Sequence, residues 1–415
     1  MDGASGSARR EQIPEDTRRF FEDLGRDVAG PLLCGMIQWS VDRIRENRPD
    51  ALLFFSRDGK ILHQLWQSLC PDDLKHIPTR YVLASRRCLR MARMQELDAD
   101  TLDFLTSHTR NLNVEGLLGR IGLERGDYIN VLSRFDGIEL ETSCALVSPE
   151  SLRKLFKDLE DILLQRAQKE GSAYRKYLES LEIQEFSRMA VFDIGWHGSL
   201  QYALLRLLQP MNPEVSLDGY YCGLFPDARR YRSTINRMEG YLLDNGQTSR
   251  RHLQIERFVE LLEFFFSAKE PGFLYCKEDG RGQPMAVFAA EDRDSHQTRA
   301  LDALQHGILD SVHREFSSVE EIYENIRRLG LEPTAREAKH LGRFRASRSF
   351  GNPEGGQPFA DPGRFLSNFL FWRDFVARYK DALWRPGFWA QLSYPERLLL
   401  RRLSPKGTRP FRSGD

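Results

Sequence analysis

The spacing of apolar residues predicts a strand followed by a turn and a helix near the start of the chain. Apolar residues recur at helical spacing over residues 14–47, where Pro31 is expected to separate two helices. The apolar run 51–55 then predicts a buried strand, and the amphipathic segment 60–69 predicts a helix. Together with the turn at 56–59, this order is the first half of a βαβ unit.

Three more strands are predicted further along the chain, and one of them repeats the same order. Residues 79–84 predict a second strand, which ends in the basic run 85–90. Residues 188–192 predict a third strand, followed by a loop over 193–199 and a helix, and a further strand is expected at 217–225. Strands that alternate with helices indicate an α/β fold with a mostly parallel sheet flanked by helices.

The rest of the chain is predicted to be largely helical. Residues 95–185 are charged and helical, and we interpret them as an insertion into a core domain of residues 15–230; its last part, 149–181, is expected to be one helix. A β-hairpin at 273–288 and further helices are expected in a C-terminal region of residues 231–403. Residues 1–14 and 404–415 are expected to be a disordered lead and tail.

Composition narrows the class of protein. The 60 Lys and Arg residues balance the 60 Asp and Glu residues, so the chain has no net charge that would attract it to nucleic acid. Any anion-binding site must therefore be a local cluster of basic residues. The six cysteines are scattered without metal-ligand spacing, as is typical of reduced thiols. No apolar run approaches the roughly 20 residues needed to span a bilayer, and the start lacks the apolar core of a signal peptide. We therefore expect a cytoplasmic protein without a transmembrane segment.

The segment after the third strand is a candidate anion site. The strand ends at Asp193, the loop contains Gly195, His197 and Gly198, and a helix begins next to Ser199. Backbone amides at a helix N-terminus, together with a serine hydroxyl, can cradle a phosphate, while the acid could face sugar hydroxyls or a metal. The alternative is a plain turn in which Asp193 caps the helix, and the pattern alone does not separate the two.

The turn after the first strand is a second candidate. Ser56, Arg57, Asp58 and Gly59 follow the buried strand, so Arg57 and Asp58 could hold a diphosphate and its Mg²⁺. The alternative is a surface turn in which Asp58 and Gly59 supply only the bend. In open parallel sheets, ligands bind at the carboxyl ends of the strands, where these turns would meet.

Two pairs of charged residues add further candidates. Arg86 and Arg87 follow the second strand and could meet the same anion or form a solvated helix face. Glu260 and Glu263 lie at i and i+3 on an otherwise apolar helix, so either could be a general base, or both could be surface residues. The sequence lacks the Walker A, GxGxxG, GxSxG and HExxH patterns, as well as the paired aspartates of phosphoaspartyl enzymes.

Three segments also resemble a known family. Residues 53–59, 81–87 and 191–201 resemble bacterial polysaccharide-locus proteins in which this region follows a haloacid-dehalogenase-like domain. The same segments look like a degenerate class I phosphoribosyltransferase core, with a diphosphate turn, a basic residue after the second strand and a 5-phosphate loop. Here one acid and Gly-Trp-His-Gly-Ser stand where that family carries two acids and Thr-Gly-Gly-Thr.

The resemblance implies a ribofuranosyltransferase. Such an enzyme would move a 5-phosphoribosyl group from phosphoribosyl diphosphate to a hydroxyl of a bacterial polysaccharide, and a separate phosphatase would remove the 5-phosphate. The resemblance also implies a role for each candidate residue. Asp58 would bind Mg²⁺, Asp193 would orient the ribose, and Glu260 or Glu263 would deprotonate the acceptor, which the C-terminal region would bind. The diphosphate would be bound by Ser56, Arg57, Gly59, Arg86 and Arg87, and the 5-phosphate by Gly195, His197, Gly198 and Ser199.

Two other functions stay open at this point. One is a haloacid-dehalogenase-type phosphohydrolase with Asp58 as nucleophile, although such enzymes need a second acid where this chain has Lys60. The other is a non-catalytic partner in polysaccharide assembly, which the altered phosphate loop would fit.

Overall fold

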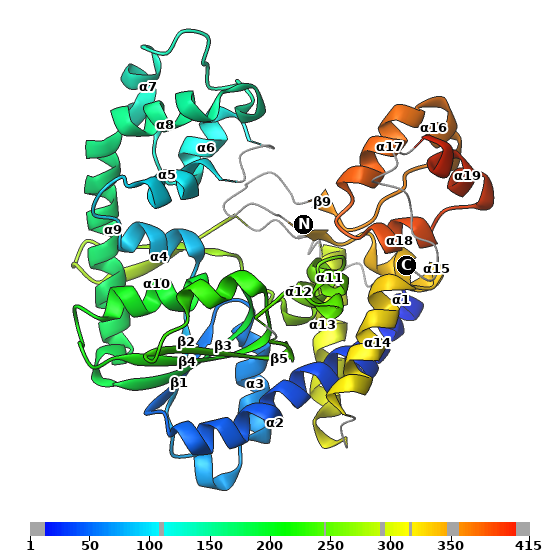
Figure 1. The fold of residues 1–415 in the computed structure, drawn as a ribbon, viewed down its shortest axis with the longest axis horizontal. Coiled ribbons are helices and arrows are strands. Elements are labelled where there is room, and N and C mark those ends of the chain that lie inside the picture. Colours follow the sequence, from blue (N-terminus) through cyan, green and yellow to red (C-terminus); the bar gives the residue numbers. More distant parts are fainter. Residues whose placement is uncertain are drawn as a thin grey trace, which may run out of the picture.

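The centre of the protein is a parallel β-sheet (Figure 1). The computed structural model describes residues 13–107, 112–244, 246–290, 295–314, 318–346 and 357–403. Five strands lie in the order β2-β1-β3-β4-β5, and every neighbouring pair is parallel. The expectation of an α/β fold with a mostly parallel sheet is therefore confirmed. The strands are β1 (Ala51–Phe55), β2 (Thr79–Val82), β3 (Arg188–Trp196), β4 (Ser216–Leu224) and β5 (Asn236–Leu243).

Both faces of the sheet are covered by helices. Alternate side chains of a strand point to opposite faces, so Phe54 and Phe192 pack against α2 and α3, whereas Phe55 and Val191 pack against α4, α9 and α10. Burial on both faces explains why β1 is apolar at every position. The bounds of these helices are α2 (Gly30–Asn47), α3 (Gly59–Leu69), α4 (Arg86–Ala92), α9 (Glu160–Ser180) and α10 (Ser199–Leu208).

The N-terminal helices run into one another. Helix α1 (Glu15–Leu24) passes through one π-helical turn, Gly25–Ala29, directly into α2, so the expected separation at Pro31 is wrong. A proline inside a helix lacks an N–H and clashes with the carbonyl four residues earlier. The π-turn just before Pro31 changes the hydrogen-bond spacing, and the helical path continues.

The helical insertion is confirmed and has a hydrophobic core of its own. Its helices α5 to α8 enclose residues such as Leu117, Leu155 and Phe156, which form a cluster distinct from those of the sheet. The expected single helix over 149–181 is two helices, because the chain leaves helical geometry at Leu159. The bounds are α5 (Ala99–Thr106), α6 (Val114–Arg120), α7 (Arg125–Leu132) and α8 (Pro149–Asp158).

The C-terminal region is helical apart from a hairpin, as expected. Strands β6 (Phe273–Glu278) and β7 (Pro284–Phe288) form the antiparallel hairpin, and the two-residue strands β8 (Arg345–Ala346) and β9 (Gln357–Pro358) pair further on. Helix α1 packs along α13, and residues of α1 and of the C-terminal region belong to one hydrophobic cluster. The helices are α11 (Arg250–Ile255), α12 (Val259–Phe266), α13 (Ser295–Asp310), α14 (Val319–Leu331), α15 (Ala335–Leu341), α16 (Phe365–Leu370), α17 (Trp372–Asp381), α18 (Arg385–Ala390) and α19 (Tyr394–Leu403).

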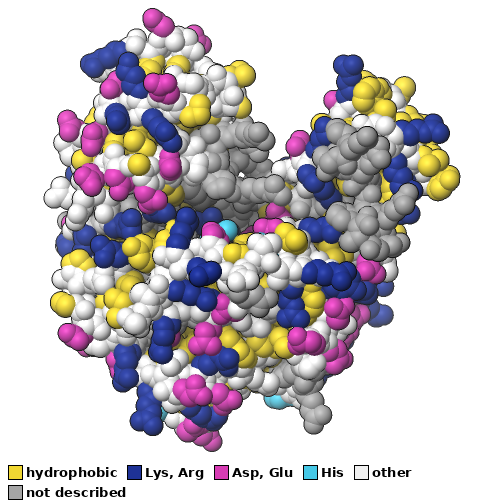
Figure 2. Space-filling model, in the orientation of Figure 1, with side chains coloured by type: hydrophobic (Ala, Val, Ile, Leu, Met, Phe, Trp, Pro, Cys, Tyr) yellow, Lys and Arg dark blue, Asp and Glu magenta, His cyan; other side chains and the backbone are white. Residues whose placement is uncertain are grey.

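The insertion stands above the sheet as one arm, and helices α16 to α19 form a second arm above α14 and α15 (Figure 1). The surface is hollowed between the arms (Figure 2). None of the helices in the described ranges is long and apolar enough to cross a bilayer. The expected tail, and all of the expected lead except Ile13 and Pro14, lie outside the described residues.

Candidate functional site

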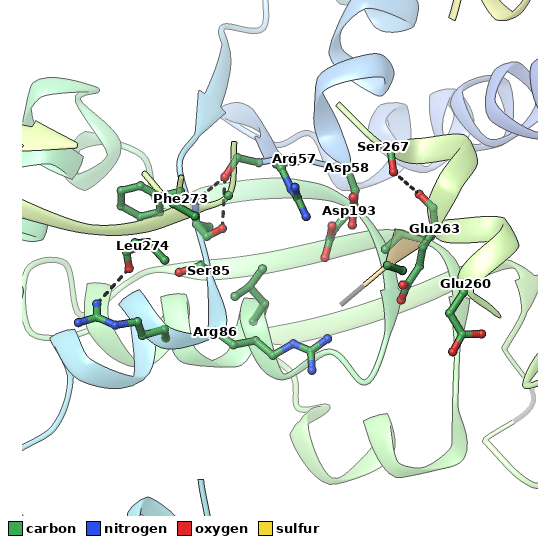
Figure 3. A pocket seen from close by; sticks show the side chains of 18 of the residues that line it. Arg57, Asp58, Ser85, Arg86, Asp193, Glu260, Glu263, Ser267, Phe273 and Leu274 are labelled. Carbon is green, nitrogen blue, oxygen red and sulfur yellow. Dashed lines mark hydrogen bonds between the residues drawn. The ribbon is translucent and has the colours of Figure 1, made fainter. Parts of the chain in front are cut away.

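A cavity of about 830 Å³ lies where β1, β2 and β3 end. The turn after β1, the segment after β2 and the β3–α10 connection all line it, as do the insertion, α12 and the β6–β7 hairpin. Figure 3 shows Arg57, Asp58, Arg86, Asp193 and Glu263 directed toward the same space. The three segments singled out from the sequence are therefore brought together at one edge of the sheet.

Strand β3 is longer than the sequence suggests. It continues through Gly195 and Trp196, which pair with Gly223 and Leu224 of β4. Asp193 thus lies inside the strand and not at its end, and the expected loop over 193–199 is reduced to His197 and Gly198. The end of the strand was misplaced because an acid is disfavoured in a strand buried on both faces. Asp193 is nevertheless buried, with 9% of its surface exposed.

Gly195 has a backbone geometry that requires glycine. Its φ is +106°, in the region that other residues rarely adopt. A Cβ at this position would lie 2.5 Å from the carbonyl oxygen of Gly223 and 2.8 Å from Cβ of Tyr221. The glycine therefore serves the close approach of β3 and β4 beside Asp193, and this close packing shapes the floor of the cavity.

Helix α10 directs its N-terminus into the cavity. It begins at Ser199, directly after Gly198, and Ser199 and Leu200 both line the cavity. Within the described ranges, the backbone N–H groups of these two residues have no hydrogen-bond acceptor. Unsatisfied N–H groups at a helix N-terminus, with the positive end of the helix dipole, favour an anion at this position.

Three acids face one another across the cavity. Burial raises the pKa of Asp193 well above its ordinary value, and the Asp58 carboxylate raises it further, while Arg86 acts in the opposite direction. Burial, and then the charges of Asp58 and Glu260, raise the pKa of Glu263 from 4.5 to about 7. A carboxyl group that titrates near neutrality can exchange a proton during a reaction, and such groups cluster at functional sites.

Two arginines at the cavity are available for an anion. Arg57 and Arg86 both line it, and neither guanidinium group makes a hydrogen bond or salt bridge with another residue in the part of the chain that the structure describes. The positive charge of Arg86 acts on both Asp193 and Glu263. The two guanidinium groups therefore offer charged donors to a ligand without breaking a contact to another described residue.

Arg87 differs from its neighbour, because the protein already uses all its donors. The side chain is buried and makes a two-pronged salt bridge to Glu170 at 2.9 Å. Its remaining N–H groups donate to the carbonyls of Arg120, Ile121 and Leu274. A guanidinium has five N–H donors, so none is left for a diphosphate. The expected role of Arg87 in diphosphate binding is wrong, and the residue instead holds the insertion to α4 and the hairpin.

Ser56 and Gly59 also have roles within the protein. The hydroxyl of Ser56 donates to the carbonyl of Ala84 at 3.2 Å and accepts from its N–H at 3.0 Å, which ties the ends of β1 and β2 together. Gly59 is buried and does not line the cavity; a Cβ there would lie 2.8 Å from the backbone of Phe54. Both residues therefore shape the turn that presents Arg57 and Asp58.

His197 has an acidic partner that the sequence did not indicate. Its Nδ1 lies 2.9 Å from a carboxylate oxygen of Asp227, which belongs to the short helix Pro226–Tyr231. His197 is exposed and lines the cavity. Because Asp227 engages one ring nitrogen, the orientation of the other, Nε2, is fixed. No motif links the two residues, which lie thirty positions apart.

The insertion supplies a wall that sequence reasoning missed. Asn113, Glu115 and Arg120 line the cavity from α6 and the residue before it. Burial lowers the pKa of Arg120 to about 10, and its guanidinium donates to the carbonyls of Leu105 and Ser107. These residues resemble ordinary helix-surface positions in the sequence, so only the fold reveals that they border the site.

Mg²⁺ was expected at Asp58. In the described ranges, no group of three or more His, Cys, Asp or Glu side chains is arranged to hold a metal. Mg²⁺ at phosphate-transfer sites commonly takes only one or two protein carboxylates, the other ligands being water and substrate phosphates. Asp58 and Asp193 fit that role, since their mutual repulsion would be relieved by a divalent cation.

No family model matches this sequence, and no curated protein sequence matches it. The case for a function therefore rests on the residues and the geometry of the cavity.

Proposed function

We propose that this chain is a glycosyltransferase that moves a 5-phosphoribosyl group from phosphoribosyl diphosphate to a hydroxyl of a bacterial polysaccharide. One observation carries the proposal. Two available arginines, a buried acid and an open helix N-terminus face a single cavity. The donor has a matching distribution of charge, with a diphosphate at C1 and a phosphate at C5 of the same ribose.

Each part of the donor has a complementary group in the cavity. Arg57 and Arg86 would bind the diphosphate through charge-assisted hydrogen bonds. The N–H groups of Ser199 and Leu200, the Ser199 hydroxyl and His197 would hold the 5-phosphate. When bound, Mg²⁺ would supply positive charge to the diphosphate, with Asp58 as its protein ligand.

The reaction replaces one C1–O bond by another. The acceptor oxygen attacks C1 as the bond to the diphosphate breaks, and the diphosphate leaves with both electrons of that bond. Positive charge develops on the ribose ring, next to the buried Asp193. The hydroxyl proton goes to Glu263, whose pKa of about 7 suits a general base near neutral pH.

The product would still carry the 5-phosphate. A separate phosphatase, acting with other polysaccharide-assembly enzymes, is therefore a proposed partner of this protein.

The deciding assay combines the protein, phosphoribosyl diphosphate, Mg²⁺ and a panel of glycan acceptors, and measures product masses. A phosphopentosyl increment is expected. Asp193→Asn should nearly abolish it while the fold is retained, and Asp58→Asn should weaken the response to Mg²⁺. Asp136→Asn, which removes an exposed charge in the insertion, is the matched control and should leave transfer unchanged.

The same assay separates the alternatives. Release of orthophosphate without an adduct, lost in Asp58→Asn, would indicate a phosphohydrolase. Lys60 stands where that chemistry needs an acid, and it forms a salt bridge to Glu270 at 3.4 Å. Donor binding without any product, unchanged in Asp193→Asn, would indicate a non-catalytic partner.

A further inference from the structure

The C-terminal arm carries apolar side chains on its outside. Leu366 and Leu370 of α16 are 73% and 75% exposed, and Phe371, between α16 and α17, is 61% exposed. Large side chains exposed to this degree over consecutive positions mark an interaction surface. The arm face consists of Phe365, Leu366, Phe369, Leu370, Phe371 and Trp372, with Tyr394 and Leu398 of α19.

Helix α16 turns its polar side inward, which is the reverse of a typical surface helix. Its one buried residue is Asn368. The amide of Asn368 donates to the buried carboxylate of Glu396 at 2.7 Å, and its oxygen accepts from Arg378 at 2.6 Å. This network fixes α16 against α19 with Leu366 and Leu370 facing outward. The buried hydrogen bonds of Asn368 therefore keep the arm face exposed.

Positive charge accompanies the arm face. Residues 361–403 contain eight Lys and Arg but four Asp and Glu, a local charge of +4, whereas the whole chain is neutral. Figure 2 shows Lys and Arg side chains beside apolar ones on this arm. Four exposed arginines lie near these apolar residues in the sequence: Arg364 directly before α16, Arg373 in α17, and Arg401 and Arg402 in α19.

We propose that the arm face docks the protein on the surface of an anionic lipid bilayer. Leucine and phenylalanine side chains enter the boundary between headgroups and acyl chains, tryptophan and tyrosine lie at the headgroup level, and arginines meet lipid phosphates. A second copy of the chain is a poorer partner, because a two-fold interface would place the arginines of the two copies against each other. This inference goes beyond the transferase function and does not depend on it.

The test uses the full chain in a flotation assay. Wild type is mixed with vesicles of phosphatidylcholine alone or of equimolar phosphatidylcholine and phosphatidylglycerol. Binding should favour the anionic vesicles and weaken with salt. The double variant Leu366→Ser, Leu370→Ser should bind them about tenfold less or weaker still, because two exposed leucines no longer enter the lipid. Arg401→Glu with Arg402→Glu should remove the preference for anionic vesicles.

Controls separate docking from misfolding. Leu366 and Leu370 are largely exposed, so circular dichroism and thermal unfolding of their double variant should match wild type. Leu146→Ser removes a leucine that is 83% exposed on the insertion, and it should bind vesicles as wild type does. Equal loss in Leu146→Ser, or equal binding to both vesicle types, would overturn the proposal. A dimer in sedimentation velocity that the double leucine variant disperses, without vesicle binding, would assign the face to a second copy.

Discussion

Replacing Glu263 by glutamine should stabilise the folded protein more strongly at neutral and alkaline pH than in acid. Glutamine has the size of the protonated carboxyl group and never carries the charge. In the folded protein, burial and the charges of Asp58 and Glu260 raise the pKa of Glu263 from 4.5 to about 7. The folded state therefore binds this proton more tightly than the unfolded chain does. Stability contributed by the proton is complete below pH 4.5 and is lost as the pH rises to about 7.

The pKa shift sets the size of the effect. Each pKa unit corresponds to about 1.4 kcal/mol, so the loss amounts to about 1 kcal/mol at pH 5 and about 3 kcal/mol at pH 8 for a shift from 4.5 to about 7. Glu263→Gln removes this loss. It also relieves Asp193, whose pKa the Glu263 charge raises, and that contribution has the same sign.

Urea unfolding of wild type and Glu263→Gln at pH 5 and pH 8 measures the difference in free energy of unfolding. The gain should be larger at pH 8 by about 2 kcal/mol. Glu141→Gln removes the same charge from an exposed position, so the gain should be absent there. An equal gain at both pH values, or none, would show that Glu263 is not held among desolvated acids. The transfer assay on Glu263→Gln should show lost activity in this more stable protein.

Four other substitutions test the parts of the site. Arg87→Ala should lower the free energy of unfolding by at least about 2 kcal/mol, because Glu170 keeps only its salt bridge to Arg166 and three carbonyls lose their donor. Arg57→Ala should change it by less than about 0.5 kcal/mol yet weaken diphosphate binding in calorimetry. Gly195→Ala should cost at least about 2 kcal/mol in the same unfolding measurement, and a cost near zero would refute the required φ. Asp227→Asn releases His197, so it should raise KM for the donor by up to about fivefold with little change in kcat; a fall in kcat alone would contradict a binding role.

The elements that were predicted correctly are those in which the pattern of apolar residues in the sequence matches the burial of those residues in the fold. β1 is apolar at every position and is followed by a polar turn and an amphipathic helix, so its place in the fold follows from a few neighbouring residues. β5 is not among the expected strands, because as an edge strand it contains Arg237 and Glu239, and its sequence resembles a polar loop.

The location of the candidate site could be predicted from the sequence, but which of its residues are available to a ligand could not. Charged residues at the ends of parallel strands must meet at one edge, which local patterns suffice to show. Whether an arginine is available depends on partners far away in the sequence. Arg86 and Arg87 look alike, yet only Arg87 meets Glu170 of the insertion, 83 positions away. Asp227 was missed for the same reason.

The order of the strands has a consequence for how the protein reaches its native state. β1 and β3 are neighbours in the sheet, but the chain between them contains the whole insertion. During synthesis β2 follows β1 closely, but β3, the other neighbour of β1, leaves the ribosome much later, and α12 follows later still. Contacts between such distant segments form slowly, and an apolar strand with one edge unpaired is prone to aggregate. The insertion has a hydrophobic core of its own, so it can fold before β3 has been made. The cavity would be completed only after most of the chain has been made.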